Sequence, residues 1–194
     1  MNKFPRSAYV HIPFCHRRCF YCDFAVIPLG NKVETLQGYG SKTVKEYLHF
    51  LYKEILSITH KSSLSTIYVG GGTPSILDPQ QIKQLIDLFK ENYGVDYGAE
   101  ITMEVDPASF NLDDLHGFIN AGINRFSLGV QSFNNQILQK SGRRHLREDA
   151  EKSCLWLKKV YSAGLIKSWS LDLIQNLPLS GFREWKEDLK KAIT

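Results

Sequence analysis

The sequence lacks the features that would place a protein in a membrane. None of its apolar runs approaches the roughly 20 residues that a helix needs to cross a bilayer. Its first residues, MNKFPRS, lead into a stretch of charge and cysteine without the apolar region of a signal peptide. We therefore expect a protein with no membrane span that resides in the cytoplasm.

A large excess of charge of one sign is also missing. The 24 lysines and arginines are balanced by 20 acidic residues, which leaves a net charge of +4 over 194 residues. These charges alternate along the expected helices, as on solvated helix faces, and do not gather into the basic stripe of a nucleic-acid-binding protein. With 43% hydrophobic residues, the composition is that of a globular protein without a nucleic-acid partner.

Cysteine is scarce and unevenly placed. Three of the four cysteines lie within eight residues, and Cys154 stands far from them. A disulfide framework would distribute its cysteines, whereas such clustering in a reducing compartment indicates metal binding. Cys154 follows a helical repeat with Ala150, Leu157 and Tyr161, so we expect it on the buried face of a helix.

Short β-rich runs alternate with segments of helical period, the pattern of βαβ units around a parallel sheet. Helical periodicity covers residues 44–58 and 82–89, Asp78 and Asn111 are expected N-caps, and Gly122 is an expected helix end. This indicates an α/β fold. Five strands are predicted, at residues 8–12, 66–70, 100–105, 125–129 and 168–174.

Five βα units fall short of a closed barrel, since the eightfold form takes about 250 residues. The sequence stops within an amphipathic helix that begins at Phe182. We therefore expect residues 1–194 to form one domain, an incomplete (β/α) barrel truncated before the remaining strands and a carboxyl-terminal domain. The polar stretch 30–42 is expected to be a loop over the functional site.

The three clustered cysteines, Cys15, Cys19 and Cys22, have the spacing C-x3-C-x2-C directly after the first strand. Three thiolates on one loop can hold three irons of a cubane and leave the fourth open to an exchangeable ligand. The alternative is structural zinc, with a fourth ligand from His11, His16 or Asp23. Zinc sites usually pair two separated cysteine knuckles, and the absence of a second knuckle favours the cluster.

Together with its neighbours, this loop resembles the radical S-adenosylmethionine (SAM) family that contains the oxygen-independent coproporphyrinogen III oxidases and the HemW-type haem chaperones. The resemblance implies a [4Fe–4S] cluster that reduces SAM by one electron, and it extends along most of the chain. Its segments are YVHIPFC at 9–15, CDF at 22–24, GGGTPS at 70–75, EVDP at 104–107, RFSLGVQSF at 125–133, GRRH at 142–145 and LDLI at 171–174.

Most of these segments end or follow a predicted strand, where parallel α/β folds place their ligands. Glycines let backbone approach a ligand, and the Arg143 guanidinium can grip a carboxylate, although a solvated arginine is the alternative. Phe14, Phe20 and Phe24 are expected to shield the cluster. No side chain is assigned a catalytic role. The resemblance implies SAM contacts at Tyr9, Tyr21, Gly71, Gly72, Thr73, Glu104, Gln131, Arg143 and Asp172.

Two functions compete within the resemblance. The oxidases, which decarboxylate coproporphyrinogen III, carry a further cysteine in C-x2-C-x-C, whereas Cys22 is followed here by Asp23-Phe24, the HemW pattern. We therefore favour a haem chaperone that transfers haem to an acceptor protein. Expected partners are haem or a porphyrin, the acceptor, and an electron donor such as flavodoxin or ferredoxin. Haem binding is expected only with the missing carboxyl-terminal region.

Overall fold

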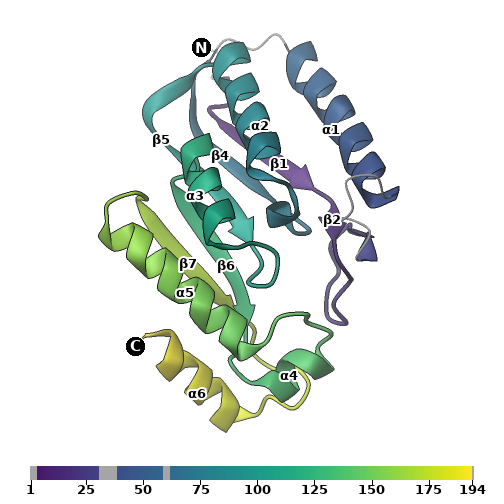
Figure 1. Ribbon diagram of the computed structural model, residues 1–194, viewed down its shortest axis with the longest axis vertical. Coiled ribbons are helices and arrows are strands. Elements are labelled where there is room, and N and C mark those ends of the chain that lie inside the picture. Colours follow the sequence, from purple (N-terminus) through teal and green to yellow (C-terminus); the bar gives the residue numbers. More distant parts are fainter. Residues whose placement is uncertain (1–3, 31–38, 59–61, 194) are drawn as a thin grey trace.

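The computed structural model describes residues 4–30, 39–58 and 62–193. Its centre is a five-stranded parallel sheet whose spatial order follows the chain, β1-β4-β5-β6-β7. This confirms the prediction of an α/β fold with five parallel strands (Figure 1). The strands are β1 (Ser7–Ile12), β4 (Leu64–Gly71), β5 (Val95–Val105), β6 (Arg125–Gln131) and β7 (Ser168–Leu173).

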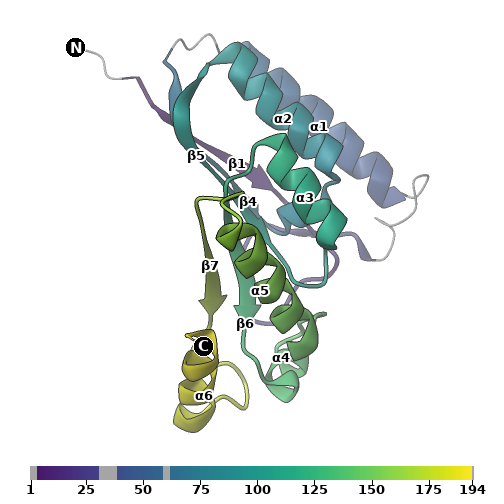
Figure 2. The ribbon, with the colours of Figure 1, turned by 60° about the vertical axis from the view of Figure 1, so that its left-hand side comes forward.

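Four helices cover one face of this sheet, as the side view in Figure 2 shows. They are α1 (Tyr39–Ser57), α2 (Pro79–Asn92), α3 (Leu112–Ala121) and α5 (Arg147–Ser162). The predicted caps are confirmed: Asp78 and Asn111 each accept the backbone N–H three residues on, and Gly122 ends α3 at φ 110°. The short α4 (Asn135–Lys140), the 3-10 turn η2 (Pro74–Ile76) and α6 (Phe182–Ala192) follow strand ends.

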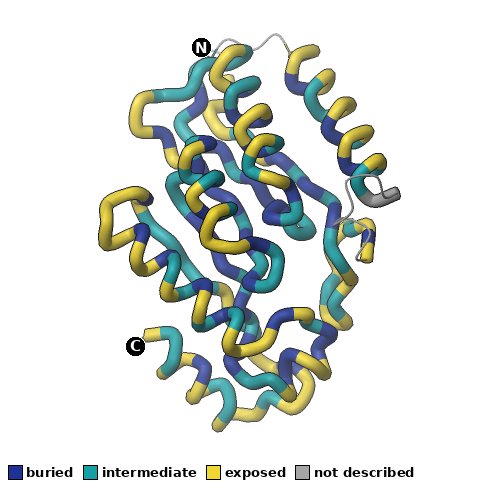
Figure 3. Tube along the Cα trace, in the orientation of Figure 1, coloured by how far each residue is buried: buried dark blue, intermediate teal, exposed yellow. Residues whose placement is uncertain are grey.

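The period of two along each strand divides the sheet into an apolar and a polar face. Val69, Met103 and Phe126 belong to the apolar face and are fully buried. Figure 3 shows that buried stretches run along the central strands. The alternate positions carry polar groups, among them His11, Tyr68, Glu104, Ser127 and Asp172. No helix covers this polar face within the described ranges, so the sheet presents its functional groups on the side away from the core.

Helix α5 corrects one sequence-based expectation. Ala150 and Leu157 are buried as predicted, but Cys154 is only partly buried and Tyr161 is 50% exposed. Val160 is also buried and shifts the centre of the buried stripe to the other side of Ala150, because each residue advances the helix by about 100°. Cys154 and Tyr161 therefore lie at the edge of that stripe.

Three further features concern the regions around the sheet. β5 begins at Val95, earlier than predicted, and the strands β2 (Phe14–Cys15) and β3 (Ile27–Pro28) form a second small sheet. The loop expected over the site, residues 30–42, lies largely outside the described residues.

Among the helices that are described, none has the length and apolarity needed to cross a membrane.

Candidate metal centre and ligand pocket

Of the three clustered cysteines, Cys15 ends β2, and Cys19 and Cys22 lie on the loop between β2 and β3. Pairing of the two strands closes this loop: the Leu29 N–H donates to the Cys15 carbonyl at 2.8 Å. Inside it, the Cys22 N–H donates to the Cys19 carbonyl at 3.1 Å, and Arg18 Nε donates to the Cys22 carbonyl at 3.1 Å. The sequence between the cysteines thus folds into a turn whose three free thiols line the same cavity.

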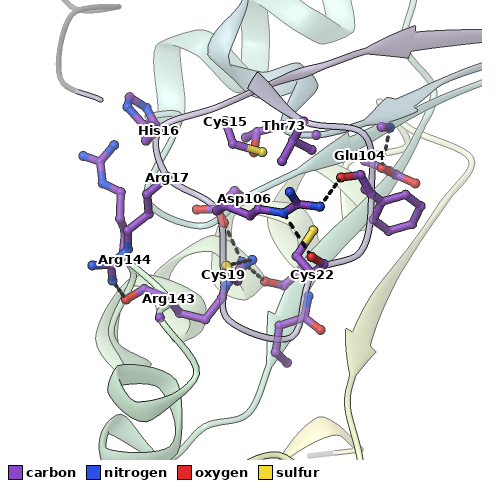
Figure 4. Close-up of a pocket in the computed structure, with 18 of the residues that line it drawn as sticks. Cys15, His16, Arg17, Cys19, Cys22, Thr73, Glu104, Asp106, Arg143 and Arg144 are labelled. Atoms are coloured by element: carbon purple, nitrogen blue, oxygen red, sulfur yellow. Dashed lines mark hydrogen bonds and ion pairs between the residues drawn. The ribbon is translucent and has the colours of Figure 1, made fainter. Parts of the chain in front are cut away.

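These thiols line a cavity of about 330 Å³ at the carboxyl ends of β4 to β7, within the usual size range of small-ligand sites (Figure 4). Of the nine residues with implied SAM contacts, eight line this cavity. The exception is Tyr9, whose hydroxyl lies 3.0 Å from His11 Nδ1 and whose ring stacks on Tyr68. Tyr9 instead borders a separate cavity between β1 and α1.

The glycine turn after β4 packs directly against the cysteine loop. Gly71 adopts φ 118°, and a Cβ on Gly72 would lie 2.6 Å from the Phe14 carbonyl oxygen, so neither position accepts a larger residue without a shift. The next residue, Thr73, donates its hydroxyl to Cys15 Sγ at 3.3 Å. Burial raises the pKa of the Cys15 thiol, and this hydrogen bond opposes the increase.

Two carboxylates face the cavity on neutral supports. Glu104 accepts from the Tyr68 hydroxyl at 2.8 Å and from the Gly71 N–H at 3.1 Å. Asp172 accepts from the Ser127 hydroxyl at 3.0 Å. Burial and then the bond to Glu104 raise the pKa of Tyr68, which therefore remains a donor. Because neutral groups orient these carboxylates, each keeps its negative charge for a ligand.

Arg143 is tied to the protein on several sides. Its Nη2 donates to Asp106 Oδ2 at 2.5 Å and to the Gly129 carbonyl at 2.7 Å, and its Nη1 lies 3.8 Å from Cys19 Sγ. Burial, the largest single influence, lowers the pKa of this guanidinium, but Asp106, Tyr21 and Cys19 together outweigh burial and the net shift is upward. The side chain is 12% exposed, so the alternative of a solvated arginine is wrong.

His145 accepts a hydrogen bond from Arg143 on the buried side of the guanidinium. The ring is fully buried, its Nδ1 accepts from Arg143 Nε at 3.3 Å, and its Nε2 lies 3.0 Å from the Val130 carbonyl. Since a carbonyl can only accept, Nε2 carries the proton. Burial lowers the pKa of His145 and favours this neutral form.

Gln131 occupies an unusual backbone position at the end of β6. Its φ is 68°, a region that non-glycine residues seldom adopt, and the register between β6 and β7 shifts between Gly129 and Gln131. This irregularity ends the regular pairing where the strand reaches the cavity, which Gln131 lines. Strained backbone of this kind clusters at ligand sites.

Sequence reasoning missed three residues of the site: Asp106, Ser127 and His145. Asp106 had a usable signal, because it stands two positions after Glu104 at the same strand end. The expected aromatic shield is wrong in part. Phe24 lines the cavity although it is 63% exposed, but Phe20 is 81% exposed, and Phe14 is buried against Tyr47 of α1, away from the cavity.

The donor set fits a [4Fe–4S] group with one open iron. Three free thiols face a single cavity, and two of them, on Cys15 and Cys19, lie near hydrogen-bond donors. In the described part of the chain, no three His, Cys, Asp or Glu side chains converge on one metal ion. Thiolates around a cubane bind different irons and are spaced accordingly.

Comparison with known proteins gives relatives of two kinds. The chain is 40% identical over 190 residues to the heme chaperone HemW of Synechocystis, covering 97% of this chain and 44% of that protein. It is 35% identical over 189 residues to HemW of Lactococcus lactis, covering 97% and 46%. To the oxygen-independent coproporphyrinogen III oxidase of Escherichia coli it is 37% identical over 180 residues, covering 90% and 36%.

The solved structure of coproporphyrinogen III oxidase (HemN) from Escherichia coli, described as a radical SAM enzyme, superposes with a TM-score of 0.77 at 32% identity. The match covers 95% of this chain and 40% of that one, so the chain spans less than half the length of these relatives. A sequence model of the radical SAM superfamily matches residues 9–172. The chain therefore belongs to the radical SAM superfamily.

Proposed function

We propose that the pocket holds a [4Fe–4S] cluster on Cys15, Cys19 and Cys22 and binds SAM beside it. The observation that carries this proposal is the convergence of three free thiols and the polar ends of four strands on one cavity. Three thiolates leave one iron without a protein ligand. That open iron would be the coordination site for the amino and carboxylate groups of SAM.

The remaining residues of the pocket are proposed to contact different parts of the SAM molecule. Glu104 and the backbone of residues 71–73 would accept hydrogen bonds from its amino group, since they offer a carboxylate and close backbone approach. Gln131 and Asp172 face the ribose and adenine, while Tyr21 and Arg143 lie on the cysteine side of the cavity. Tyr9 is left out of this assignment because it borders the other cavity.

When bound, such a cluster supplies one electron to the sulfonium of SAM. The protein's own contribution is to orient the ligand and to keep charges fixed around it. The Arg143–Asp106 pair and the Tyr68–Glu104 hydrogen bond do this without any group having to move. No side chain of the pocket is assigned a proton-transfer role.

For the whole protein we propose a HemW-like haem chaperone of the cytoplasm, where thiols stay reduced. Support comes from the HemW relatives and from Cys22-Asp23-Phe24. Oxygen-independent coproporphyrinogen oxidase is the second candidate, favoured by one relative and the solved structure. We propose that residues 1–194 form one partial barrel. Haem binding, haem transfer to an acceptor and reduction by an electron donor such as flavodoxin are proposed only for a protein that continues beyond residue 194.

Metal analysis of the protein purified without oxygen tests the cluster. After reconstitution with iron and sulfide, we expect both in the protein and an EPR signal of the reduced cluster that changes on addition of SAM. Replacing Cys15, Cys19 and Cys22 with alanine should abolish iron uptake, whereas Cys154→Ala, a partly buried thiol outside the pocket, should keep it. Zinc without iron or labile sulfide would refute the cluster and support the structural zinc site.

A second experiment separates chaperone from enzyme. A form of the protein that continues beyond residue 194 is reconstituted and incubated with coproporphyrinogen III, SAM and a reductant, and the products are analysed for decarboxylation. In parallel, haem is titrated and followed by absorbance, with transfer to an acceptor as the further readout. Decarboxylated product would reverse our preference, and saturable haem binding without decarboxylation would support it.

A further inference from the structure

Thr73 places a hydroxyl group on the sulfur of a cluster cysteine. Its Oγ1 donates to Cys15 Sγ at 3.3 Å, across 58 positions of sequence. Thr73 also stands at the N-cap position of the turn η2, where threonine hydroxyls commonly bond a backbone N–H. Here the side chain makes no cap hydrogen bond, so its donor is directed to the sulfur.

Backbone contacts fix this donor, so it does not depend on a flexible side chain. The Gly72 N–H donates to the Ile12 carbonyl at 2.8 Å, and a Cβ on Gly72 would lie 3.0 Å from Cys15 Sγ. On the other side, the Ile76 N–H donates to the Thr73 carbonyl at 3.0 Å. Threonine has one torsion between backbone and hydroxyl, so the position of these two turns determines the hydrogen bond.

The other two cysteines differ from Cys15 in this respect. Cys19 is approached by Arg143 Nη1 at 3.8 Å, a longer contact from a guanidinium already bound to Asp106. Among the hydrogen bonds of the described residues, none reaches the sulfur of Cys22. The bond from Thr73 is therefore shorter than the contact from Arg143, while the Tyr21 hydroxyl is a further neighbour of Cys19 and not of Cys15.

We propose that Thr73 raises the reduction potential of the cluster through this hydrogen bond. The inference rests on the cluster proposed above. One electron converts [4Fe–4S]²⁺ to [4Fe–4S]⁺, and a chemical reductant such as dithionite supplies it. The added charge is shared by the ligand sulfurs, so a fixed donor stabilises the reduced form more than the oxidised form. Thr73 thus acts through Cys15, as a positioning residue.

The test is a redox titration followed by EPR, on the reconstituted protein and without SAM. Leaving SAM out ensures that a lost SAM contact cannot move the midpoint. Thr73→Val keeps the shape and removes the donor, so its midpoint should shift to a more negative potential. Thr73→Ser restores a hydroxyl and should return the midpoint toward that of the unmodified protein, at equal iron content per chain.

A midpoint in Thr73→Val equal to that of the unmodified protein, at equal iron content, would overturn the inference and leave the proposed function standing. Should Thr73→Val fail to take up iron, Thr73→Ala is measured, because a smaller side chain cannot crowd the loop. If neither variant holds a cluster, Thr73 serves to build the loop and the inference is wrong. Failure of the unmodified protein to hold iron and sulfide would defeat both proposals.

Discussion

The two sides of the cavity hold charge in opposite ways. On the arginine side, formed by Arg143, Asp106 and His145, every strong donor meets a protein acceptor and the ion pair is largely buried. On the carboxylate side, formed by Glu104 and Asp172, the supports are neutral and neither acid pairs with a lysine or arginine among the described residues.

This difference indicates that the arginine side maintains the structure of the site and that the carboxylate side binds the ligand. The largely buried ion pair of Arg143 and Asp106 connects β5, β6 and the cysteine loop. Removing one partner leaves the other as an uncompensated buried charge, which destabilises this arrangement. Carboxylates on neutral supports keep most of their charge for a cationic or hydroxyl-bearing ligand. We therefore expect substitutions on the arginine side to alter stability, and those on the carboxylate side to alter binding.

The largest effect should follow Arg143→Ala. Removing the cation leaves Asp106 partly buried without its partner, and we expect the free energy of unfolding to fall by about 3 kcal/mol. Urea denaturation of the iron-free protein measures it. Arg147→Ala is the control, since its pair with Glu151 is exposed and a much smaller change is expected. Equal stability of Arg143→Ala and the unmodified protein would remove the basis of the comparison.

The glycine turn lies between Glu104 and the cysteine loop, and Gly72→Ala should lower the free energy of unfolding by roughly 2 kcal/mol. The new Cβ meets the Phe14 carbonyl at 2.6 Å, and backbone cannot yield as a side-chain tip does. Iron uptake should fall as well, because Cys15 is displaced. Gly164→Ala provides the control: it has a positive φ and open space, so it should lose about 1 kcal/mol and keep its iron.

Glu104→Gln should separate binding from stability. The variant loses the carboxylate proposed to accept from the SAM amino group, and we expect a tenfold weaker affinity, which corresponds to about 1.4 kcal/mol. Equilibrium dialysis with labelled SAM on reconstituted protein gives the value. Glu100→Gln, on the same strand but outside the cavity, should bind SAM normally. If both variants bind alike, the carboxylate side has no special role.

The smallest effect concerns His145 and pH. Burial, the main cause, lowers its pKa below the ordinary value near 6.5; Arg143 adds to this, while Asp106 and Asp149 oppose it. The unfolded chain then binds a proton that the native protein does not, so stability is full above about pH 6.5 and falls as pH decreases below it. Urea unfolding at about pH 7 and about pH 5 should show a steeper loss for the unmodified protein than for His145→Gln. Parallel losses would contradict the prediction.

Much of the fold and of the cysteine site was predictable because its signals are local. The spacing of Cys15, Cys19 and Cys22 is contained in eight residues, and the caps at Asp78 and Asn111 bond within three residues of themselves. Strand and helix periods are local in the same sense. The exposed Phe20 was mispredicted because its burial depends on whether another segment covers the loop.

The sequence by itself determined the element order and the three-thiol loop, since both depend on neighbours in the chain, and the alternation of strands with helices indicated a parallel sheet. The tertiary structure alone decided the pairing of Arg143 with Asp106, 37 positions away, and the bond from Thr73 to Cys15. It also separated Tyr9 from the cavity. The physical reason is that a charge or a hydroxyl can bond many partners, and only the packing of the strands determines which one lies within reach.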